Sequence, residues 1–147
     1  MKTIALYGKS NCGKTSALKA VYKKIKEDNA KEIYFKDYEQ GDITAVFKYK
    51  GKYIGFTTYG DNDITLKEPL EQICGYDCDI CIAASRTSGS SVEEIRKIES
   101  DNLIWLKKAD LGYIGDICPT TEEYDAVNEI QARMIFEQIQ KLLSSDN

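Results

Sequence analysis

The sequence predicts a single α/β domain over residues 1–147, built in three layers around a mostly parallel sheet with one antiparallel hairpin at about residues 43–59. Two observations carry this prediction. Short apolar runs, typical of buried parallel strands, alternate along the chain with segments whose apolar residues recur three and four positions apart, as on one face of a helix. In the first half of the chain, two β-rich runs are separated by Lys50-Gly51-Lys52, which favours a hairpin turn.

The chain begins with an apolar strand at Thr3–Tyr7, and a helical pattern runs from Gly13 to about Glu27. Strand, glycine loop and helix are the context in which the phosphate-binding motif G-x-x-x-x-G-K-[ST] occurs. The motif is matched at every position by Gly8, Lys9, Ser10, Asn11, Cys12, Gly13, Lys14 and Thr15. The segment resembles the phosphate-binding loop (Walker A motif) of the P-loop NTPases, so we expect a P-loop NTPase-like fold.

This resemblance implies that residues 8–16 surround the phosphates of a nucleotide. Gly8 and Gly13 have no Cβ, so the backbone can approach the phosphate oxygens, and the N–H groups of the loop and helix form an anion cradle. Lys14 would bind the β- and γ-phosphates and is expected to face the ligand and not the core. Thr15 would hold Mg²⁺, and Ser16 would add a hydroxyl near the phosphates.

The remaining elements follow from the same periodicities. Pro69 fits the first turn of a short helix, Ser90 or Ser91 is expected to N-cap another, and Thr120 with Glu123 fits a capping box for the last. The expected strands are Glu32–Tyr38, Ile43–Tyr49, Tyr53–Tyr59, Cys78–Ala84 and Leu103–Leu106; the expected helices are Leu66–Ile73, Val92 to about Glu99, and Thr120 to about Leu143, the last with an apolar stripe of Tyr124, Val127, Ile130, Met134, Ile135, Ile139 and Leu142. That stripe is expected to pack on the sheet, with a dimer seam as the alternative.

A metal-binding acid is expected near the end of the hairpin. P-loop proteins need a carboxylate at the end of a strand next to the loop, to hold Mg²⁺ directly or through water. Asp61 is the nearest equivalent, with Asp63 as the second choice. The alternative is that Gly60-Asp61-Asn62 is only a polar turn.

The loop that follows the buried strand Cys78–Ala84 is a second candidate site. It contains Arg86, several hydroxyls and Gly89, at a position where open α/β sheets place ligand contacts. Arg86 would contact a phosphate, a substrate carboxylate or the charge that develops on the γ-phosphate. The alternative is a serine-rich connection with a surface arginine.

The base preference is predicted from residues 107–110. GTPases carry Asn/Thr-Lys-x-Asp after a late strand, and Lys108-Ala109-Asp110 resembles that motif, but Lys107 replaces its first residue. There is also no Asp-x-x-Gly after the hairpin. We therefore expect ATP to be preferred to GTP.

Composition excludes several classes of function. The absence of histidine excludes histidine triads and histidine-bound metals. Cys74, Cys78 and Cys81 have the spacing of a radical SAM cluster, but Cys81 lies inside an apolar strand and the chain is too short for that fold.

No apolar stretch is long enough for a membrane span. Nucleic-acid binding is not expected, because no basic run is interleaved with aromatic residues. Five cysteines without a secretion signal indicate a cytoplasmic protein with reduced thiols.

Together these patterns predict Mg²⁺-dependent binding and slow hydrolysis of a purine nucleoside triphosphate, with Lys14, Asp61 and Arg86 as the catalytic side chains. One alternative is a small-molecule or nucleoside kinase, in which Asp37 and Arg86 hold an acceptor. Another is a GTPase-like or nucleotide-sensing interaction module with little turnover, in which the hairpin senses the γ-phosphate and binds a protein partner.

Overall fold

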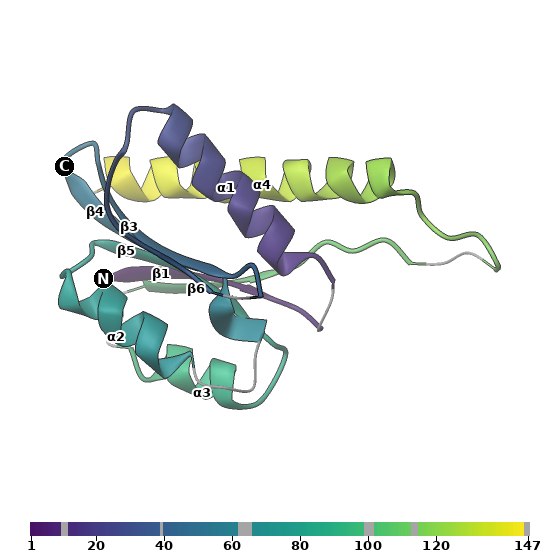
Figure 1. Ribbon diagram of the computed structural model, residues 1–147, viewed down its shortest axis with the longest axis horizontal. Helices are drawn as coiled ribbons and strands as arrows, with labels where there is room; N and C mark the ends of the chain where they lie inside the picture. The colour runs from purple at the N-terminus through teal and green to yellow at the C-terminus, as the bar shows by residue number, and fades with distance from the viewer. Residues whose placement is uncertain (10–11, 39, 62–65, 99–101, 113–114, 146–147) are drawn as a thin grey trace.

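The computed structural model describes the whole chain except residues 10–11, 39, 62–65, 99–101, 113–114 and 146–147, and gives the backbone alone for Asp61 and Asn102 (Figure 1). In chain order the elements are β1 (Lys2–Tyr7), α1 (Lys14–Glu27), β2 (Lys31–Asp37), β3 (Ile43–Tyr49), β4 (Lys52–Thr57), the 3-10 turn η1 (Tyr59–Asp61), α2 (Lys67–Gly75), β5 (Ile80–Ser85), α3 (Ser90–Arg96), β6 (Asn102–Lys107) and α4 (Thr121–Ser144).

The six strands form one mixed sheet in the order β2-β3-β4-β5-β1-β6. β1 pairs in parallel with β5 on one side and with β6 on the other, and β4 pairs in parallel with β5. Only β3 runs against its neighbours, in antiparallel ladders with β2 and β4. The prediction of a mostly parallel sheet with an antiparallel hairpin is therefore confirmed.

Helices cover both faces of this sheet, so the three-layer architecture is also confirmed. α1 and α4 lie side by side on one face, and α2 and α3 lie on the other (Figure 1). β5 is buried along its whole length because it lies inside the sheet and has helices on both faces, and its residues are apolar from Ile80 to Ala84. Among the described residues, no helix is both long and apolar enough to cross a membrane.

The predicted N-cap of α3 is wrong. α3 begins at Ser90 with Gly89 as its N-cap, so neither Ser90 nor Ser91 caps it. The Ser91 hydroxyl instead accepts a hydrogen bond from Arg86 N (3.0 Å) and lies 3.2 Å from Ser85 Oγ. Ser91 therefore fixes the loop after β5, at the edge of the sheet where ligand contacts were expected.

The predicted stripe of α4 is correct at Ile135, Ile139 and Leu142, and it packs on the sheet, but Ile130 and Met134 are each 53% exposed. Gln131 is buried in their place and accepts a hydrogen bond from Ala109 N at 2.6 Å. The inward face of α4 is thus set partly by a polar anchor, which hydropathy cannot identify. The predicted capping box at Thr120 and Glu123 is confirmed.

Candidate nucleotide-binding site

The carboxyl ends of β4, β5, β1 and β6 meet at one edge of the sheet. Gly8 N donates to Ser85 O (3.1 Å), and Lys108 N donates to Tyr7 O (2.7 Å), so the segments after β5 and β6 flank the glycine loop that follows β1. η1 is pressed against the end of β5, since a Cβ added to Gly60 would lie 1.6 Å from Ala84 O. The topology therefore brings the backbones of the predicted segments at 8–16, 60–61, 86 and 108–110 to a common edge.

The glycine loop has the backbone that the motif requires at its second glycine. Gly13 adopts φ 94°, in the left-handed region that side chains disfavour, and it is the N-cap of α1 without a side-chain cap from the described residues. No acidic side chain lies in the first turn of α1. The N–H groups at this helix end are therefore available to an anion, and the helix dipole favours negative charge there. Ser10 and Asn11 lie outside the described residues.

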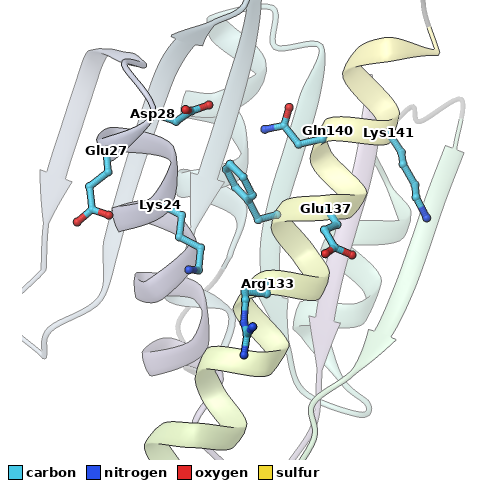
Figure 2. A pocket seen from close by; sticks show the side chains of 8 residues that line it. Lys24, Glu27, Asp28, Arg133, Glu137, Gln140 and Lys141 are labelled. Atoms are coloured by element: carbon cyan, nitrogen blue, oxygen red, sulfur yellow. The ribbon is translucent and has the colours of Figure 1, made fainter.

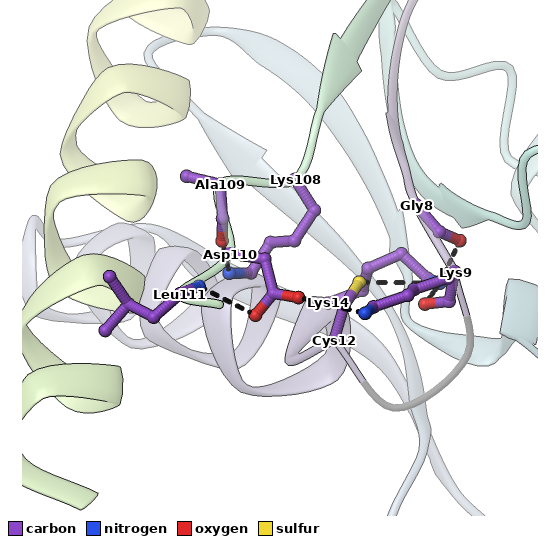
Figure 3. Close-up of polar contacts among 8 residues, drawn as sticks. All are labelled: Gly8, Lys9, Cys12, Lys14, Lys108, Ala109, Asp110 and Leu111. Carbon is purple, nitrogen blue, oxygen red and sulfur yellow. Dashed lines mark hydrogen bonds and ion pairs between the residues drawn. The ribbon is translucent and has the colours of Figure 1, made fainter. Parts of the chain in front are cut away.

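Lys14 lies inside the loop and is only 2% exposed. Its Nζ donates to Gly8 O (2.6 Å) and Lys9 O (2.8 Å), and it lies 4.0 Å from Cys12 Sγ (Figure 3). Lys14 was expected to face the ligand and not the core; its side chain is buried within the glycine motif, because two backbone carbonyls accept hydrogen bonds from the ammonium group. The cation nevertheless lies among the backbone groups that would surround a phosphate.

A second lysine, Lys108, is buried against the same loop. Its side-chain carbons approach both motif glycines: its Cβ lies 3.2 Å from where a Cβ on Gly8 would be, and its Cε lies 3.5 Å from the corresponding point on Gly13. Burial lowers the pKa of Lys108, and nearby Cys12 opposes that shift. The Nζ donates to Ala109 O, as Figure 3 shows. Two ammonium groups are therefore buried at one loop, where they would attract an anion.

Among the described residues, the carboxylate that contacts the predicted metal ligand Thr15 is that of Asp42, which sequence analysis did not select. Thr15 Oγ1 donates to Asp42 Oδ1 at 3.2 Å, and Thr58 Oγ1 donates to the same oxygen at 2.8 Å. Asp42 is 8% exposed, and within the described part of the chain it forms no ion pair. Burying a carboxylate that has only neutral partners is costly, so a cation beside it would be stabilised.

The antiparallel hairpin explains how Asp42 reaches this site. β3 starts where β4 ends, because Thr58 N donates to Ile43 O (2.9 Å) and Ile43 N donates to Thr58 Oγ1 (2.9 Å). The residue before β3 therefore lies at the same edge as the residues after β4. The predicted hairpin contained this information, since an acid directly before its first strand must lie beside the end of its second.

The other predicted acids are Asp61, Asp63 and Asp37, and within the described residues none of their side chains contacts Thr15. The backbone of Asp61 reaches the common edge in η1, but its side chain lies outside the described residues, as does all of Asp63. Asp37 ends β2, which is separated from β1 by three strands. It is nevertheless paired with Ile43, the residue after Asp42, so the backbone of Asp37 lies at the end of the hairpin where Asp42 contacts Thr15.

A pocket of about 570 Å³ opens beside the glycine loop. Its volume lies within the range of about 300–1,000 Å³ that is usual for small-molecule sites. Asp110 at its rim pairs with Lys9 (3.6 Å) and accepts a hydrogen bond from Leu111 N (2.9 Å). The pocket is lined by Lys9, Cys12, Gly13, Ser16, Asp110, Leu111, Gly112, Tyr124, Asp125 and Asn128.

A larger groove of about 710 Å³ lies between α1 and α4, where side chains from both helices face one another (Figure 2). None of the predicted site residues lines it. Its polar groups are engaged locally: Lys24 pairs with Glu129 (2.6 Å), Asp28 accepts from the Tyr49 hydroxyl, and Gln140 Nε2 donates to that hydroxyl at 2.7 Å. We assign this groove no function.

Of the three clustered cysteines, Cys78 and Cys81 are buried and Cys74 is exposed. Burial raises the pKa of the Cys78 thiol to about 12, and it also raises the pKa of Cys81. Within the described residues, no group of three histidine, cysteine or acidic side chains could hold a metal ion. A site at Thr15 and Asp42 would need further oxygen ligands, from a phosphate, water or Asp61.

Comparisons with protein-family models, with curated proteins and with solved structures find no match for this chain.

Proposed function

We propose that this protein binds a purine nucleoside triphosphate with Mg²⁺, prefers ATP, and hydrolyses it slowly. The observation that carries the proposal is the glycine motif from Gly8 to Thr15, which joins β1 to the start of α1 and has the side chains of Lys14 and Lys108 buried at it. The N–H groups at the start of α1 and the ammonium group of Lys14 would bind phosphate oxygens. The adjoining pocket of about 570 Å³ would receive the nucleoside.

The side chains of Thr15 and Asp42 fit a magnesium ion. A hydroxyl and a buried carboxylate without an ion-pair partner among the described residues are oxygen ligands of the kind that Mg²⁺ takes, directly or through water. When bound, Mg²⁺ would offset negative charge on the phosphates. Asp61 remains the acid proposed from the sequence, and Asp42 is added to it on the contact with Thr15. Arg86 remains a proposed source of further positive charge.

Phosphate release from ATP separates this proposal from its alternatives. We expect slow release without any acceptor, well below the median enzyme turnover of about 10 s⁻¹. A Lys14→Ala preparation serves as the background control. Consumption that occurs only with one member of a panel of nucleosides and small alcohols would favour a kinase instead. Tight binding without turnover would favour an interaction module.

One observation supports the interaction module. Thr15 and Thr58 both donate hydrogen bonds to Asp42, so the start of α1 is linked to the residues that precede β3 and follow β4.

The base preference is a separate prediction. We expect ATP to displace a fluorescent nucleotide at least as well as GTP, because Lys107 breaks the guanine motif and Asp110 is engaged with Lys9. Asp110→Ala should change the affinity for ATP little, as should Asp116→Ala at an exposed position of the same connection. A strong preference for GTP that disappears only in Asp110→Ala would instead identify a guanine-binding acid.

A further inference from the structure

A separate pocket lies on the opposite face of the sheet, between α3 and the ends of β1 and β6. Its volume is about 230 Å³, and it is lined by Tyr7, Arg86, Thr87, Val92, Arg96 and Trp105. Tyr7 immediately precedes Gly8, whereas Lys9 lines the proposed nucleoside pocket. The two pockets therefore flank the start of the glycine loop on different faces of the sheet.

The apolar part of this pocket exists because one corner of the sheet is incompletely covered. β6 is an edge strand, and α3 has only seven residues, so Trp105 in β6 is half-buried. Its ring meets that of Tyr7 edge to face, with centroids 6.2 Å apart and an interplanar angle of 74°. With Val92, these rings offer an aromatic and aliphatic wall that a third ring could contact in the geometry aromatic pairs prefer.

The polar part of the pocket is cationic. Arg86 is half-buried, and its backbone is held on both sides, since Arg86 N donates to Ser91 Oγ (3.0 Å) and Ser85 Oγ donates to Arg86 O (2.8 Å). Arg96, at the end of α3, adds a second guanidinium group. No acidic side chain is among the described residues that line the pocket. Guanidinium groups are suited to carboxylate and phosphate oxygens.

We propose that this pocket binds a small aromatic anion, meaning a single ring that carries a phosphate or carboxylate group. The volume of about 230 Å³ is below the usual range for drug-sized or nucleotide ligands, so it limits the ligand to about one ring and its charged substituent. Trp105, Tyr7 and Val92 would contact the ring, and Arg96 would bind the anionic group at the side of the pocket where Arg86 lies. Arg86 is also proposed for the nucleotide site, whereas Arg96, Trp105, Tyr7 and Val92 belong to this pocket alone.

Trp105 is the only tryptophan in the chain, so its fluorescence reports on this pocket directly. Phenyl phosphate is the test ligand, with inorganic phosphate lacking the ring and phenol lacking the charge. We expect phenyl phosphate to change the fluorescence saturably, and each of the other two to bind at least about tenfold more weakly, because each loses one class of contact. Phenylacetate in place of phenyl phosphate tests whether a carboxylate suffices.

Arg96→Gln is the decisive variant, because Arg96 lies on the surface and has no role in the proposed nucleotide site. It should weaken phenyl phosphate binding by about tenfold or more and leave the affinity for ATP unchanged. Lys97→Gln, which removes an exposed cation next to Arg96 but outside the pocket, should leave both unchanged. Lys14→Ala should abolish ATP binding and keep the Trp105 response, which separates failure of one site from failure of the other.

Three results would overturn the inference: no saturable fluorescence change with phenyl phosphate or phenylacetate, equal responses to inorganic phosphate alone, or an unchanged affinity in a folded Arg86→Gln/Arg96→Gln double variant.

Discussion

Replacing Lys14 by alanine is expected to reduce the affinity for ATP by about a hundredfold or more, because one or two charge-assisted hydrogen bonds of about 1.5–3 kcal/mol each are lost. Lys14 is buried among loop carbonyls, so the substitution also removes its bonds to Gly8 O and Lys9 O. A fall in the free energy of unfolding by about 1–3 kcal/mol should accompany the loss of binding. Calorimetric titration and thermal unfolding measure the two effects separately.

Two further variants separate the loss of the Lys14 charge from a loss of folding. Lys14→Met keeps most of the buried aliphatic volume and removes only the charge, so it should fold and still fail to bind ATP. Lys23→Ala is the matched control on α1, where the side chain of Lys23 is 76% exposed and lies 3.9 Å from Glu27. It should bind ATP normally. Wild-type affinity in a folded Lys14→Met protein would refute the phosphate-binding role of the loop.

Asp42→Asn is expected to raise the Mg²⁺ concentration needed for half-maximal ATP binding by about tenfold, which corresponds to about 1.4 kcal/mol of lost attraction. The amide oxygen of asparagine can still accept from Thr15 and Thr58, so the shape of the site is kept. Because the substitution removes a buried charge that has only neutral partners among the described residues, thermal stability without ligand should not fall. Loss of metal affinity without loss of stability distinguishes a metal acid from a structural one.

The same experiment, a titration with Mg²⁺ at a fixed ATP concentration, is carried out on Asp61→Asn and on Asp37→Asn. A shift in both Asp42→Asn and Asp61→Asn would show that the two acids share the metal. A shift in Asp61→Asn alone would support the sequence-based assignment and remove Asp42. Asp37→Asn should match the wild type, since the side chain of Asp37 is exposed and, within the described residues, makes no hydrogen bond or ion pair with Thr15 or Asp42. Wild-type magnesium dependence in all three would mean that the metal acid lies elsewhere.

The elements were predictable because their signals are local. The apolar run of β5 and the capping box at Thr120 are each specified within a few residues. The strand, loop and helix at residues 2–27 were identified for the same reason, together with the motif that places Lys14 and Thr15.

The missed features depend on contacts between segments far apart in the chain. Asp42 and Thr15 are 27 residues apart, and they meet only because β3 is antiparallel to β4. Gln131 is buried because Ala109 N, 22 residues before it, needs an acceptor. Burial of Lys14 could not be read from a motif that describes the loop with its ligand. Periodicity identifies none of these contacts. The predicted hairpin places Asp42 beside the end of β4, but the contact of Asp42 with Thr15 depends on the order of the strands in the sheet.

The measurement that bears most directly on the central claim is a calorimetric titration of the wild-type protein with ATP, in Mg²⁺ and again with the metal chelated by EDTA. We predict saturable binding at one site per chain, with a lower affinity in EDTA and no measurable binding by Lys14→Ala in either buffer. The absence of saturable binding of ATP and of GTP to the folded wild-type protein in Mg²⁺ would contradict the claim that residues 8–15 form a nucleotide-binding loop.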